Sequence, residues 1–445
     1  MVERETWATR VGFILAAIGS AVGLGNIWRF PFQTASSGGS AFLAVYLLAV
    51  VVIGIPALLA EFVIGRRTHL DAINAFKRLG RSQWLFVGAL GIVGSFWTLS
   101  YYSVVGGWVI RYVVGSLNGN ALVAPGDYFG AVSAGPEAVA FHAAFMLITV
   151  VIVALGIERG IELATKFMVP SIVVLLLGLA VFAATLPGAG QGYEFLFSFE
   201  PGAIASNAST VIPAAVGQAL FSLSVGFSVM ITYASYIGKD DNLFTDGVTI
   251  AVSNTFVGVL AGLVVLPLLA TQTGNPGEGG PGAVFVAIPT ALANLPLGRV
   301  VGVVFFLVVL IAALSSSISL LEAVTSYLVD QGLSRVPTAA GLGAIIFLLG
   351  VPSAWDTAWL SWFDGIAVAL FLPITVLLVV VFVGWVMGRD AMDELRQGMG
   401  SDGIAPLWLW ALRTVVLLAV IGVVALNLYD LFLTPEKGVY IVPPL

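Results

Sequence analysis

Cysteine is absent from this chain of 445 residues, and histidine occurs only twice, at His69 and His142. Disulfide bonds, catalytic thiolates and iron–sulfur clusters are excluded, because each of them requires cysteine. Two isolated histidines are too few for a metal cluster or a proton relay. The chain also lacks a glycine-rich phosphate-binding loop that ends in lysine. The sequence therefore indicates no class of enzyme.

Charged residues are also scarce. They make up 9% of the chain, while 59% of the residues are hydrophobic and the mean hydropathy is +1.04. A soluble domain carries roughly 25% charged residues, so this composition indicates an integral membrane protein with the lipid bilayer as its partner. The net charge of −6 argues against nucleic acid as a partner. The sequence does not indicate an oligomeric state.

Apolar runs long enough to cross the hydrocarbon core, about 20 residues each, occur eleven times. The expected spans are 11–34, 41–64, 84–115, 139–156, 163–186, 208–236, 246–272, 299–330, 338–352, 358–387 and 406–433. The first run is too long for a cleavable signal peptide and has no small-residue cleavage site. We therefore expect one all-α domain over residues 1–433, followed by a tail at 434–445.

Basic residues gather in the loops on one side of these spans, beginning with Arg4 and Arg10 and continuing with five between positions 66 and 81. The positive-inside rule places this side in the cytoplasm. We expect a multi-pass protein of the plasma membrane with a cytoplasmic N-terminus. Because the number of spans is odd, the tail at 434–445 is expected to be extracellular.

The first span is interrupted by the sequence Gly-Ser-Ala-Val-Gly-Leu-Gly-Asn at residues 19–26. Three glycines in so short a run disfavour a helix. Within hydrocarbon, a helix break is tolerated only where the freed backbone groups face a cavity or a ligand. This run predicts that the chain holds ions or solutes partway across a bilayer.

A second weak helix occurs in the sixth span, which contains Ser-Leu-Ser-Val-Gly at residues 222–226. Spans one and six each begin a set of five helices, and their odd and even positions make them antiparallel. Two interrupted segments at matching places indicate the binding site of a transporter. The alternative is that glycine and serine serve only close helix packing. The first interpretation predicts repeats at about 11–186 and 208–387, with an extra helix at about 406–433.

These residues give the chain a resemblance to the neurotransmitter:sodium symporter family. The resemblance is carried by Trp7-Ala8-Thr9-Arg10, Gly19 to Asn26, Trp28-Arg29-Phe30-Pro31, Gly38-Gly39, Ala41-Phe42, Gly217-Gln218, Phe221-Ser222-Leu223-Ser224, Gly226-Phe227, Ile231 to Tyr236, and Ser315-Ser316-Ser317-Ile318. It implies sodium-coupled symport by alternating access, on a 5+5 inverted repeat whose helices 1 and 6 are unwound at mid-membrane. Ser37 and Ser40 depart from the family signature, and we expect them to affect loop packing only.

The resemblance implies two sodium sites built from oxygen ligands, which hard cations prefer. The first takes the Ala21 carbonyl and the side chains of Asn26, Ser222 and Asn254, together with the substrate carboxylate. The second takes the carbonyls of Gly19, Val22 and Ala312 and the hydroxyls of Ser315 and Ser316. Read alone, the serine run at 315–317 also fits helix–helix hydrogen bonding.

The resemblance likewise implies a site for an amino acid. Its carboxylate would meet Leu24, Gly25, Tyr102 and the first sodium ion, and its amine would meet oxygens of Ala21, Phe221, Ser222 and Ser224. The remaining expected pocket residues are Ser20, Gly23, Thr98, Phe227, Met230, Ser316, Ser319 and Leu320. Relatives that select amines carry aspartate where this chain has Gly23. Gly23 therefore favours a solute that carries its own carboxylate, and the apolar and aromatic residues of the expected pocket favour a neutral hydrophobic or aromatic amino acid.

Gates and a chloride ion are further implications of the resemblance. Arg29 and Asp364 are the expected outer gate, with Asp356 as a rival acid and with Tyr102 and Phe227 as the lid beneath. Arg4 and Asp330 are the expected cytoplasmic gate, supported by Trp7, Ser235 and Tyr236. Glu61 is expected to accept hydrogen bonds from the freed amides, and Glu322 has no assigned role. Gly160 and Pro170 either allow the fifth span to unwind or simply mark a helix start.

Where many relatives have an acid or serine in span seven, this chain has Gly258. Tyr46, Gln218, Ser222 and Asn254 could still coordinate chloride, and we hypothesise that transport depends on it. Two other functions stay open. One is sodium-coupled transport of a different solute, such as betaine or an amine, which neutral amino acids would not inhibit. The other is a channel, which would not accumulate solute against a gradient, or a non-transporting sensor.

Overall fold

The computed structural model describes residues 5–199, 201–238, 240–271, 283–399, 403–433 and 443–444. No β-strand occurs within these ranges, which confirms the predicted all-α class. Nine segments of the described chain are long and apolar enough to cross a membrane. They are α3 to α4 (Ser40–Thr68), η3 to α6 (Ser82–Asn118), α9 (Pro136–Ala154), η4 to α10 (Ile157–Ala184), α15 (Leu243–Ala270), α17 (Gly298–Asp330), α18 (Arg335–Trp355), α19 to η6 (Thr357–Met387) and α22 to α23 (Ile404–Leu433).

Two further segments are interrupted. Helix α1 (Arg10–Ala21) ends within the glycine run at residues 19–26, and the chain resumes as η1 (Gly25–Arg29) and α2 (Phe30–Ser36) after a bend of 48°. Helix α13 (Ala208–Ser222) is separated from α14 (Val229–Ala234) by six residues. Within that gap Ser224, Gly226 and Ser228 all have positive φ, which stops the winding of a right-handed helix. Ten expected spans overlap the nine segments and the bent pair, and the sixth, 208–236, contains α13 and α14.

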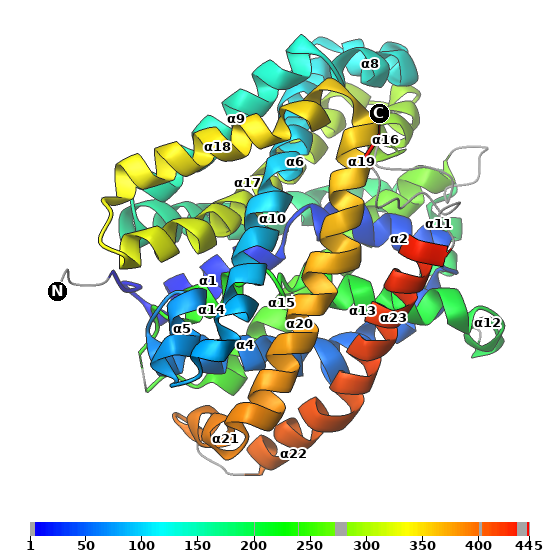
Figure 1. The fold of residues 1–445 in the computed structure, drawn as a ribbon. Coiled ribbons are helices and arrows are strands. Elements are labelled where there is room, and N and C mark those ends of the chain that lie inside the picture. Colours follow the sequence, from blue (N-terminus) through cyan, green and yellow to red (C-terminus); the bar gives the residue numbers. More distant parts are fainter. Residues whose placement is uncertain are drawn as a thin grey trace.

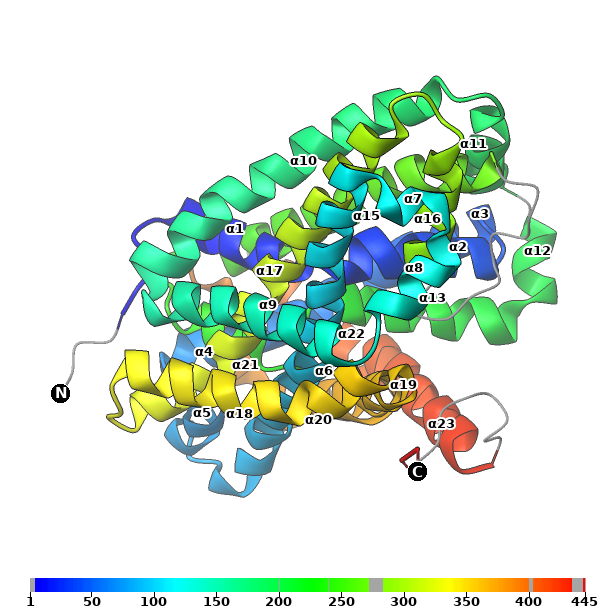
Figure 2. The ribbon, with the colours of Figure 1, turned by 90° about the horizontal axis from the view of Figure 1, so that it is seen from above.

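Short helices lie at the two ends of the bundle. They are α5 (Ala72–Arg78), α7 (Asn120–Val123), α8 (Pro125–Val132), α11 (Ala189–Phe197), α12 (Pro201–Ser206), α16 (Ala283–Ala293) and α21 (Arg389–Arg396). Helix α5 lies at the end where α1 starts, and α8, α11 and α16 lie at the opposite end (Figures 1 and 2). The central helix α17 packs against α1, α6, α10 and α14, so it adjoins both interrupted segments.

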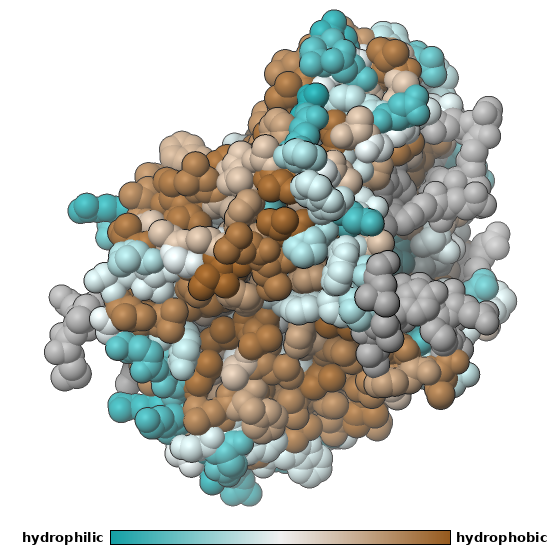
Figure 3. Space-filling view, turned by 45° about the horizontal axis from the view of Figure 1, so that its top comes forward, coloured by the Kyte–Doolittle hydropathy of each residue, from teal (hydrophilic) through white to brown (hydrophobic). Residues whose placement is uncertain are grey.

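The outer surface of the bundle is largely apolar. Leu147, Phe167, Val181, Leu348 and Leu418 are each at least 65% exposed, and Figure 3 shows a broad hydrophobic face between hydrophilic patches. Exposing such side chains to water would be unfavourable. This surface therefore suits lipid, while the polar side chains around the two interruptions are buried inside the bundle.

Candidate functional site

Two cavities adjoin the interruption in α1. The outer cavity has a volume of about 310 Å³ and the inner one about 30 Å³. Both are lined by Leu24, Gly25, Tyr102 and Phe221, so these four residues form the boundary between them. Only the outer volume reaches the range of small-molecule pockets, roughly 300–1,000 Å³. The inner cavity must therefore widen before a small solute can occupy it.

The inner cavity brings together most of the expected pocket residues. Its lining is Ser20, Ala21, Gly23, Leu24, Gly25, Thr98, Tyr102, Phe221, Ser224, Phe227, Ser316 and Leu320. The three expected pocket residues outside this lining, Ser222, Met230 and Ser319, are buried. Ser319 still adjoins the cavity wall, because its hydroxyl lies 2.7 Å from the Ser20 hydroxyl.

Hydroxyl groups satisfy the backbone freed by the interruption. The Ser20 carbonyl accepts hydrogen bonds from Ser224 Oγ at 2.9 Å and from Ser316 Oγ at 2.8 Å. The Leu24 amide donates to the Tyr102 hydroxyl at 3.2 Å. At Gly23, a Cβ atom would lie 2.9 Å from the Tyr102 hydroxyl oxygen and would collide with Ser316 Oγ. Only glycine fits there without movement of its neighbours, so the wall beside Tyr102 is bare backbone.

Four oxygen atoms converge where the two interruptions meet α15. Asn26 Nδ2 donates to the side-chain oxygen of Asn254 at 2.8 Å. That oxygen also lies 3.0 Å from the Ser222 carbonyl, 3.1 Å from the Ala21 carbonyl and 3.3 Å from Asn26 Oδ1. Because the atom at this position faces acceptors, the Asn254 amide is better placed after rotation by 180°, and its nitrogen then donates to the same three oxygens.

These contacts are as short as hydrogen bonds. Oxygens that share a hard cation at 2.3–2.6 Å stand roughly 3.2–3.7 Å apart in an octahedral shell, whereas two of the three contacts are 3.0 and 3.1 Å. Hydrogen bonds from the rotated Asn254 amide satisfy these oxygens in this structure, and a cation held among them would require them to move slightly apart. The donor set is neutral and consists of amide and carbonyl oxygens, so it suits a monovalent ion better than a divalent one.

The second expected sodium set is assembled in part. Ser315 Oγ lies 2.9 Å from the Ala312 carbonyl and 3.3 Å from the Val22 carbonyl, so it bridges α17 and the end of α1. A Cβ atom on Gly19 would lie 3.4 Å from Ser315 Cβ. Ser316 differs, because its hydroxyl donates to Ser20 and lines the inner cavity.

Arg29 and Asp364 both line the outer cavity. No ion pair joins them in the described part of the chain. The Arg29 guanidinium lies 4.8 Å from the centre of the Phe221 ring, and Asp364 accepts a hydrogen bond from the Tyr101 hydroxyl at 2.9 Å. The rival acid, Asp356, caps α19 instead, by accepting from the Ala358 amide at 2.8 Å.

The aromatic residue paired with Tyr102 differs from the expected one. Phe221 lines both cavities, whereas Phe227 lines only the inner one. Phe221 belongs to the last turn of α13, where its ring centre lies 4.8 Å from the Arg29 guanidinium, whereas Phe227 lies in the gap before α14. Phe221 and Tyr102 therefore form the partition between the cavities.

At the opposite end of the bundle, polar contacts close the space below α14. Trp7 Nε1 donates to the Tyr233 carbonyl at 3.0 Å, and Tyr236 donates to Glu322 at 2.8 Å. Arg335 pairs with Glu322 at 2.6 Å, which gives that buried acid the partner that the sequence left open. Asp330 accepts from the Asp71 amide at 3.0 Å. Its expected partner, Arg4, lies outside the described residues.

Glu61 is fully buried on α4 (Ile55–Thr68), and it accepts a hydrogen bond from the Gly226 amide at 2.6 Å. Gly226 lies in the gap between α13 and α14. The prediction that Glu61 binds an amide freed by a helix interruption is confirmed.

The expected chloride ligands lie close together. The Tyr46 hydroxyl is 3.3 Å from Ser222 Oγ, and Ser222 Oγ is 3.2 Å from Asn254 Nδ2. Gln218 Nε2 is turned away to the Gly25 carbonyl, at 2.8 Å. A Cβ atom on Gly258 would lie 3.4 Å from Asn26 Nδ2, an ordinary contact, so a methyl group fits at this position.

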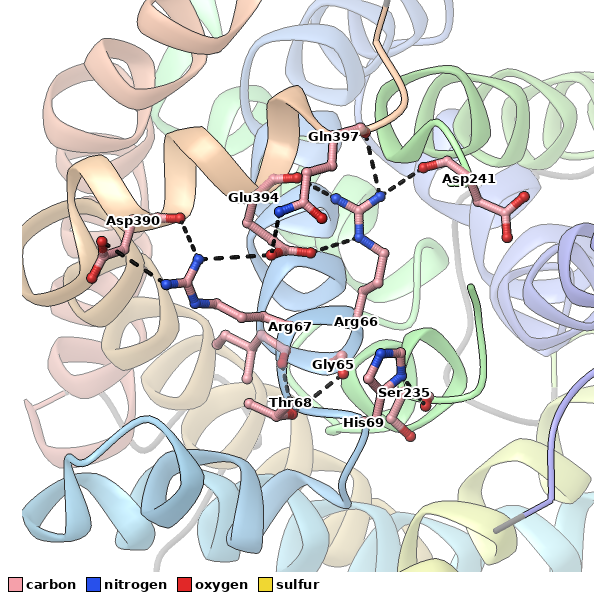
Figure 4. A network of polar contacts seen from close by, with 11 residues as sticks. Gly65, Arg66, Arg67, Thr68, His69, Ser235, Asp241, Asp390, Glu394 and Gln397 are labelled. Atoms are coloured by element: carbon pink, nitrogen blue, oxygen red, sulfur yellow. Dashed lines mark hydrogen bonds and ion pairs between the residues drawn. The ribbon is translucent and has the colours of Figure 1, made fainter. Parts of the chain in front are cut away.

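A buried ionic network joins the end of α4 to α21, away from the cavities (Figure 4). The Arg66 side chain is fully buried, pairs with Glu394 at 2.7 Å and donates to the Asp241 carbonyl at 2.6 Å. Arg67 lies 3.7 Å from the same acid. The sequence showed these arginines only as basic loop residues, because their partners lie far along the chain.

Comparison with known proteins gives consistent matches over the whole chain. A model of the sodium:neurotransmitter symporter family matches residues 4–123 and 134–444. A protein of Bacillus subtilis (strain 168), described as the uncharacterized sodium-dependent transporter YhdH, is 34% identical over 95% of this chain and 97% of its own length. The human sodium- and chloride-dependent neutral and basic amino acid transporter B(0+) is 24% identical over 92% of this chain and 76% of its own length.

A solved structure matches as well. The crystal structure of MhsT in complex with L-phenylalanine is similar to this fold with a TM-score of 0.87. The two chains are 39% identical, and the match covers 96% of this chain and 100% of MhsT.

Proposed function

This chain belongs to the sodium:neurotransmitter symporter family, whose members are membrane transporters rather than enzymes, and from this premise we propose that it couples sodium entry to the uptake of a neutral amino acid. The proposed substrate is hydrophobic or aromatic, and transport proceeds by alternating access. The proposed location is the plasma membrane, with the N-terminus in the cytoplasm, as the basic loops favour.

The observation that carries this proposal is the convergence of the Ala21 and Ser222 carbonyls with the side-chain amides of Asn26 and Asn254 beside the inner cavity. A cation held there would lie between the two interrupted segments. It would face the side of the cavity that Leu24 and Gly25 line. A substrate carboxylate could then bind the cation and these amides together, as anions do at helix N-termini.

Three features support an amino acid as the substrate. The absence of a side chain at Gly23 leaves no built-in carboxylate, so the solute must bring its own. Phe221, Phe227 and Leu320 supply apolar contact for its side chain. MhsT, which shares this fold, was solved with L-phenylalanine bound.

In the proposed architecture, α13 and α14 together form the sixth of eleven spans. The repeats cover about 11–186 and 208–387, and both interruptions lie at mid-membrane. The helix near 406–433 is an addition to this 5+5 arrangement, and residues 434–445 form an extracellular tail beyond the single domain at 1–433.

The outer cavity is the proposed substrate entry route. Closure would bring Arg29 and Asp364 together above the Tyr102–Phe221 partition, because unpaired charges at membrane depth are costly. At the cytoplasmic end, Trp7, Tyr236, Arg4 and Asp330 would separate when the inner gate opens. Chloride, held by Tyr46, Gln218, Ser222 and Asn254, is the proposed counter-charge for the first sodium ion.

A binding screen of the twenty standard amino acids, with and without sodium, tests the proposal. We expect sodium-dependent binding of a neutral amino acid, and we expect Asn26→Ala to abolish it. Asn207→Ala, at the exposed start of α13, is the matched control and should bind like the unmodified protein. Unchanged sodium-dependent affinity in Asn26→Ala would refute the site assignment.

A further inference from the structure

The backbone around Phe227, in the gap between α13 and α14, is bound from two sides. The amide of the preceding residue, Gly226, donates to Glu61 on α4. The Phe227 carbonyl accepts a hydrogen bond from the hydroxyl of Ser95, which is fully buried on α6 (Leu85–Asn118). The peptide groups on both sides of Phe227 are therefore fixed to α4 and to α6.

Close packing restricts the same segment further. A Cβ atom on Gly91 of α6 would collide with Ser228 Oγ and would lie 3.1 Å from the Ser228 amide nitrogen. A Cβ atom on Gly226 would lie 2.8 Å from the Leu372 carbonyl oxygen, at the start of α20 (Leu372–Val381). The backbone that carries Phe227 therefore has no room to shift toward α6 or α20.

The ring of Phe227, in contrast, has room behind it. A Cβ atom on Gly94 of α6 would lie 3.6 Å from Phe227 Cδ1 and 3.3 Å from Cβ of Phe371, the last residue of η5 (Ala367–Phe371). Gly94 is buried and lies outside the lining of the inner cavity, whereas Phe227 lines it. The missing side chain at position 94 therefore leaves a space about the size of a methyl group on the side of the ring away from the cavity.

This space matters because the inner cavity, at about 30 Å³, has to widen before it can hold a solute. Hydrogen bonds hold its walls at the Ser20 carbonyl and the Leu24 amide, and the Phe221 ring lies against Arg29. The Phe227 ring can turn about its own side-chain torsions while its backbone stays in place. Its movement toward Gly94 would enlarge the cavity.

We propose that Ser95 and Gly94 together set the largest amino-acid side chain that the inner cavity accepts. Ser95 is a positioning residue, because it fixes the backbone from which the Phe227 ring extends. Gly94 determines specificity, because it leaves the space into which that ring withdraws. This proposal rests on the proposed binding of a neutral amino acid in the inner cavity.

Gly94→Ala tests the proposal by filling the space with one methyl group. Sodium-dependent binding is measured in detergent for alanine, valine, leucine, phenylalanine and tryptophan. We expect the affinity for the largest amino acid that the unmodified protein binds to fall about tenfold or more relative to that for alanine, as one methyl group does in other apolar pockets. The affinity for alanine itself should be retained, which also shows that the variant is folded.

Gly178→Ala is the matched control. Gly178 lies on α10 (Leu163–Ala184), and a Cβ atom there would meet open space. This variant makes the same change within a membrane-spanning helix but far from Phe227 in contacts. We expect it to bind all five amino acids like the unmodified protein.

Ser95→Ala should act in the opposite direction. Without this hydroxyl the Phe227 carbonyl is released from α6, so the backbone can yield to a larger solute. We expect the affinity for the largest amino acid to rise about threefold relative to that for alanine. This variant also tests the proposal if Gly94→Ala does not fold, which size-exclusion chromatography would reveal.

A rescue variant shows whether the ring is the group that the methyl blocks. Adding Phe227→Leu to Gly94→Ala removes the ring and should return the affinity ratio toward that of the unmodified protein. The proposal is overturned if Gly94→Ala weakens all five amino acids equally, or if Ser95→Ala shifts the ratio in the same direction as Gly94→Ala. Failure of the proposed function has a different signature, since the unmodified protein would then bind none of the five amino acids with or without sodium, and this proposal would fail with it.

Discussion

Replacing Tyr102 by phenylalanine should weaken substrate binding strongly. The Tyr102 hydroxyl accepts from the Leu24 amide at 3.2 Å and lies at the boundary of the two cavities. In the proposed complex it donates to the substrate carboxylate. Tyr102→Phe therefore removes a hydrogen bond to a charged group while the buried aromatic ring is kept.

The size of the loss follows from the chemistry of that bond. A hydrogen bond to a charged group contributes about 1.5–3 kcal/mol, which corresponds to a loss of about 10- to 150-fold in affinity. The measurement is sodium-dependent binding, in detergent, of the amino acid that binds most tightly in the screen.

Tyr101→Phe is the matched control, since it removes a hydroxyl from the neighbouring tyrosine. That hydroxyl donates to Asp364, and Tyr101 lines only the outer cavity. The affinity of Tyr101→Phe for the amino acid should stay within about threefold of the affinity of the unmodified protein, a difference of less than about 1 kcal/mol in binding free energy. The reasoning fails if Tyr102→Phe binds within threefold of the unmodified protein, or if both variants lose affinity equally.

Two further changes probe the chloride hypothesis and the buried network. Gly258→Glu places a fixed carboxylate near Asn26. Transport by this variant should persist when gluconate replaces chloride, whereas transport by the unmodified protein should be lost. Equal behaviour of the two proteins would exclude the chloride hypothesis. Arg66→Leu leaves Glu394 buried without its main partner and should lower the free energy of unfolding by about 3–5 kcal/mol. Arg67 is partly exposed, so Arg67→Leu should lower it by about 1 kcal/mol or less. Similar losses in the two variants, measured by thermal unfolding, would contradict this account.

Local composition predicts both helix interruptions, because glycine and serine runs weaken a helix wherever they occur. It cannot show which side chain faces which cavity. Phe221 lies in α13 and faces Arg29, whereas Phe227 lies in the gap after this helix, between Gly226 and Ser228, which both have positive φ. The cavity that each ring lines depends on this path of the chain. For the same reason Ser316 was expected at the second sodium site, yet its hydroxyl donates to the Ser20 carbonyl.

Acids whose partners are distant in the chain were the least predictable. Glu162 meets the Ala8 amide and the Thr9 hydroxyl, 154 and 153 positions earlier. Glu322 meets Tyr236 and Arg335. Intramembrane charge shows only that such an acid needs a partner. The identity of the partner depends on helix packing, which no local pattern encodes.

The geometry also explains why sodium and substrate should bind cooperatively. The Ala21 carbonyl lies 3.1 Å from the side-chain amide of Asn254, and the neighbouring Ser20 carbonyl accepts hydrogen bonds from the hydroxyls of Ser224 and Ser316. One interruption therefore presents adjacent carbonyls to the proposed cation and to the substrate cavity.

An ion that fixes this backbone removes part of the ordering cost of binding the substrate, and a bound carboxylate supplies the ion with a further ligand. Linkage requires that each raises the affinity of the other by the same factor. A sodium affinity that does not change between zero and saturating substrate would show that the two sites are independent, whatever their proximity.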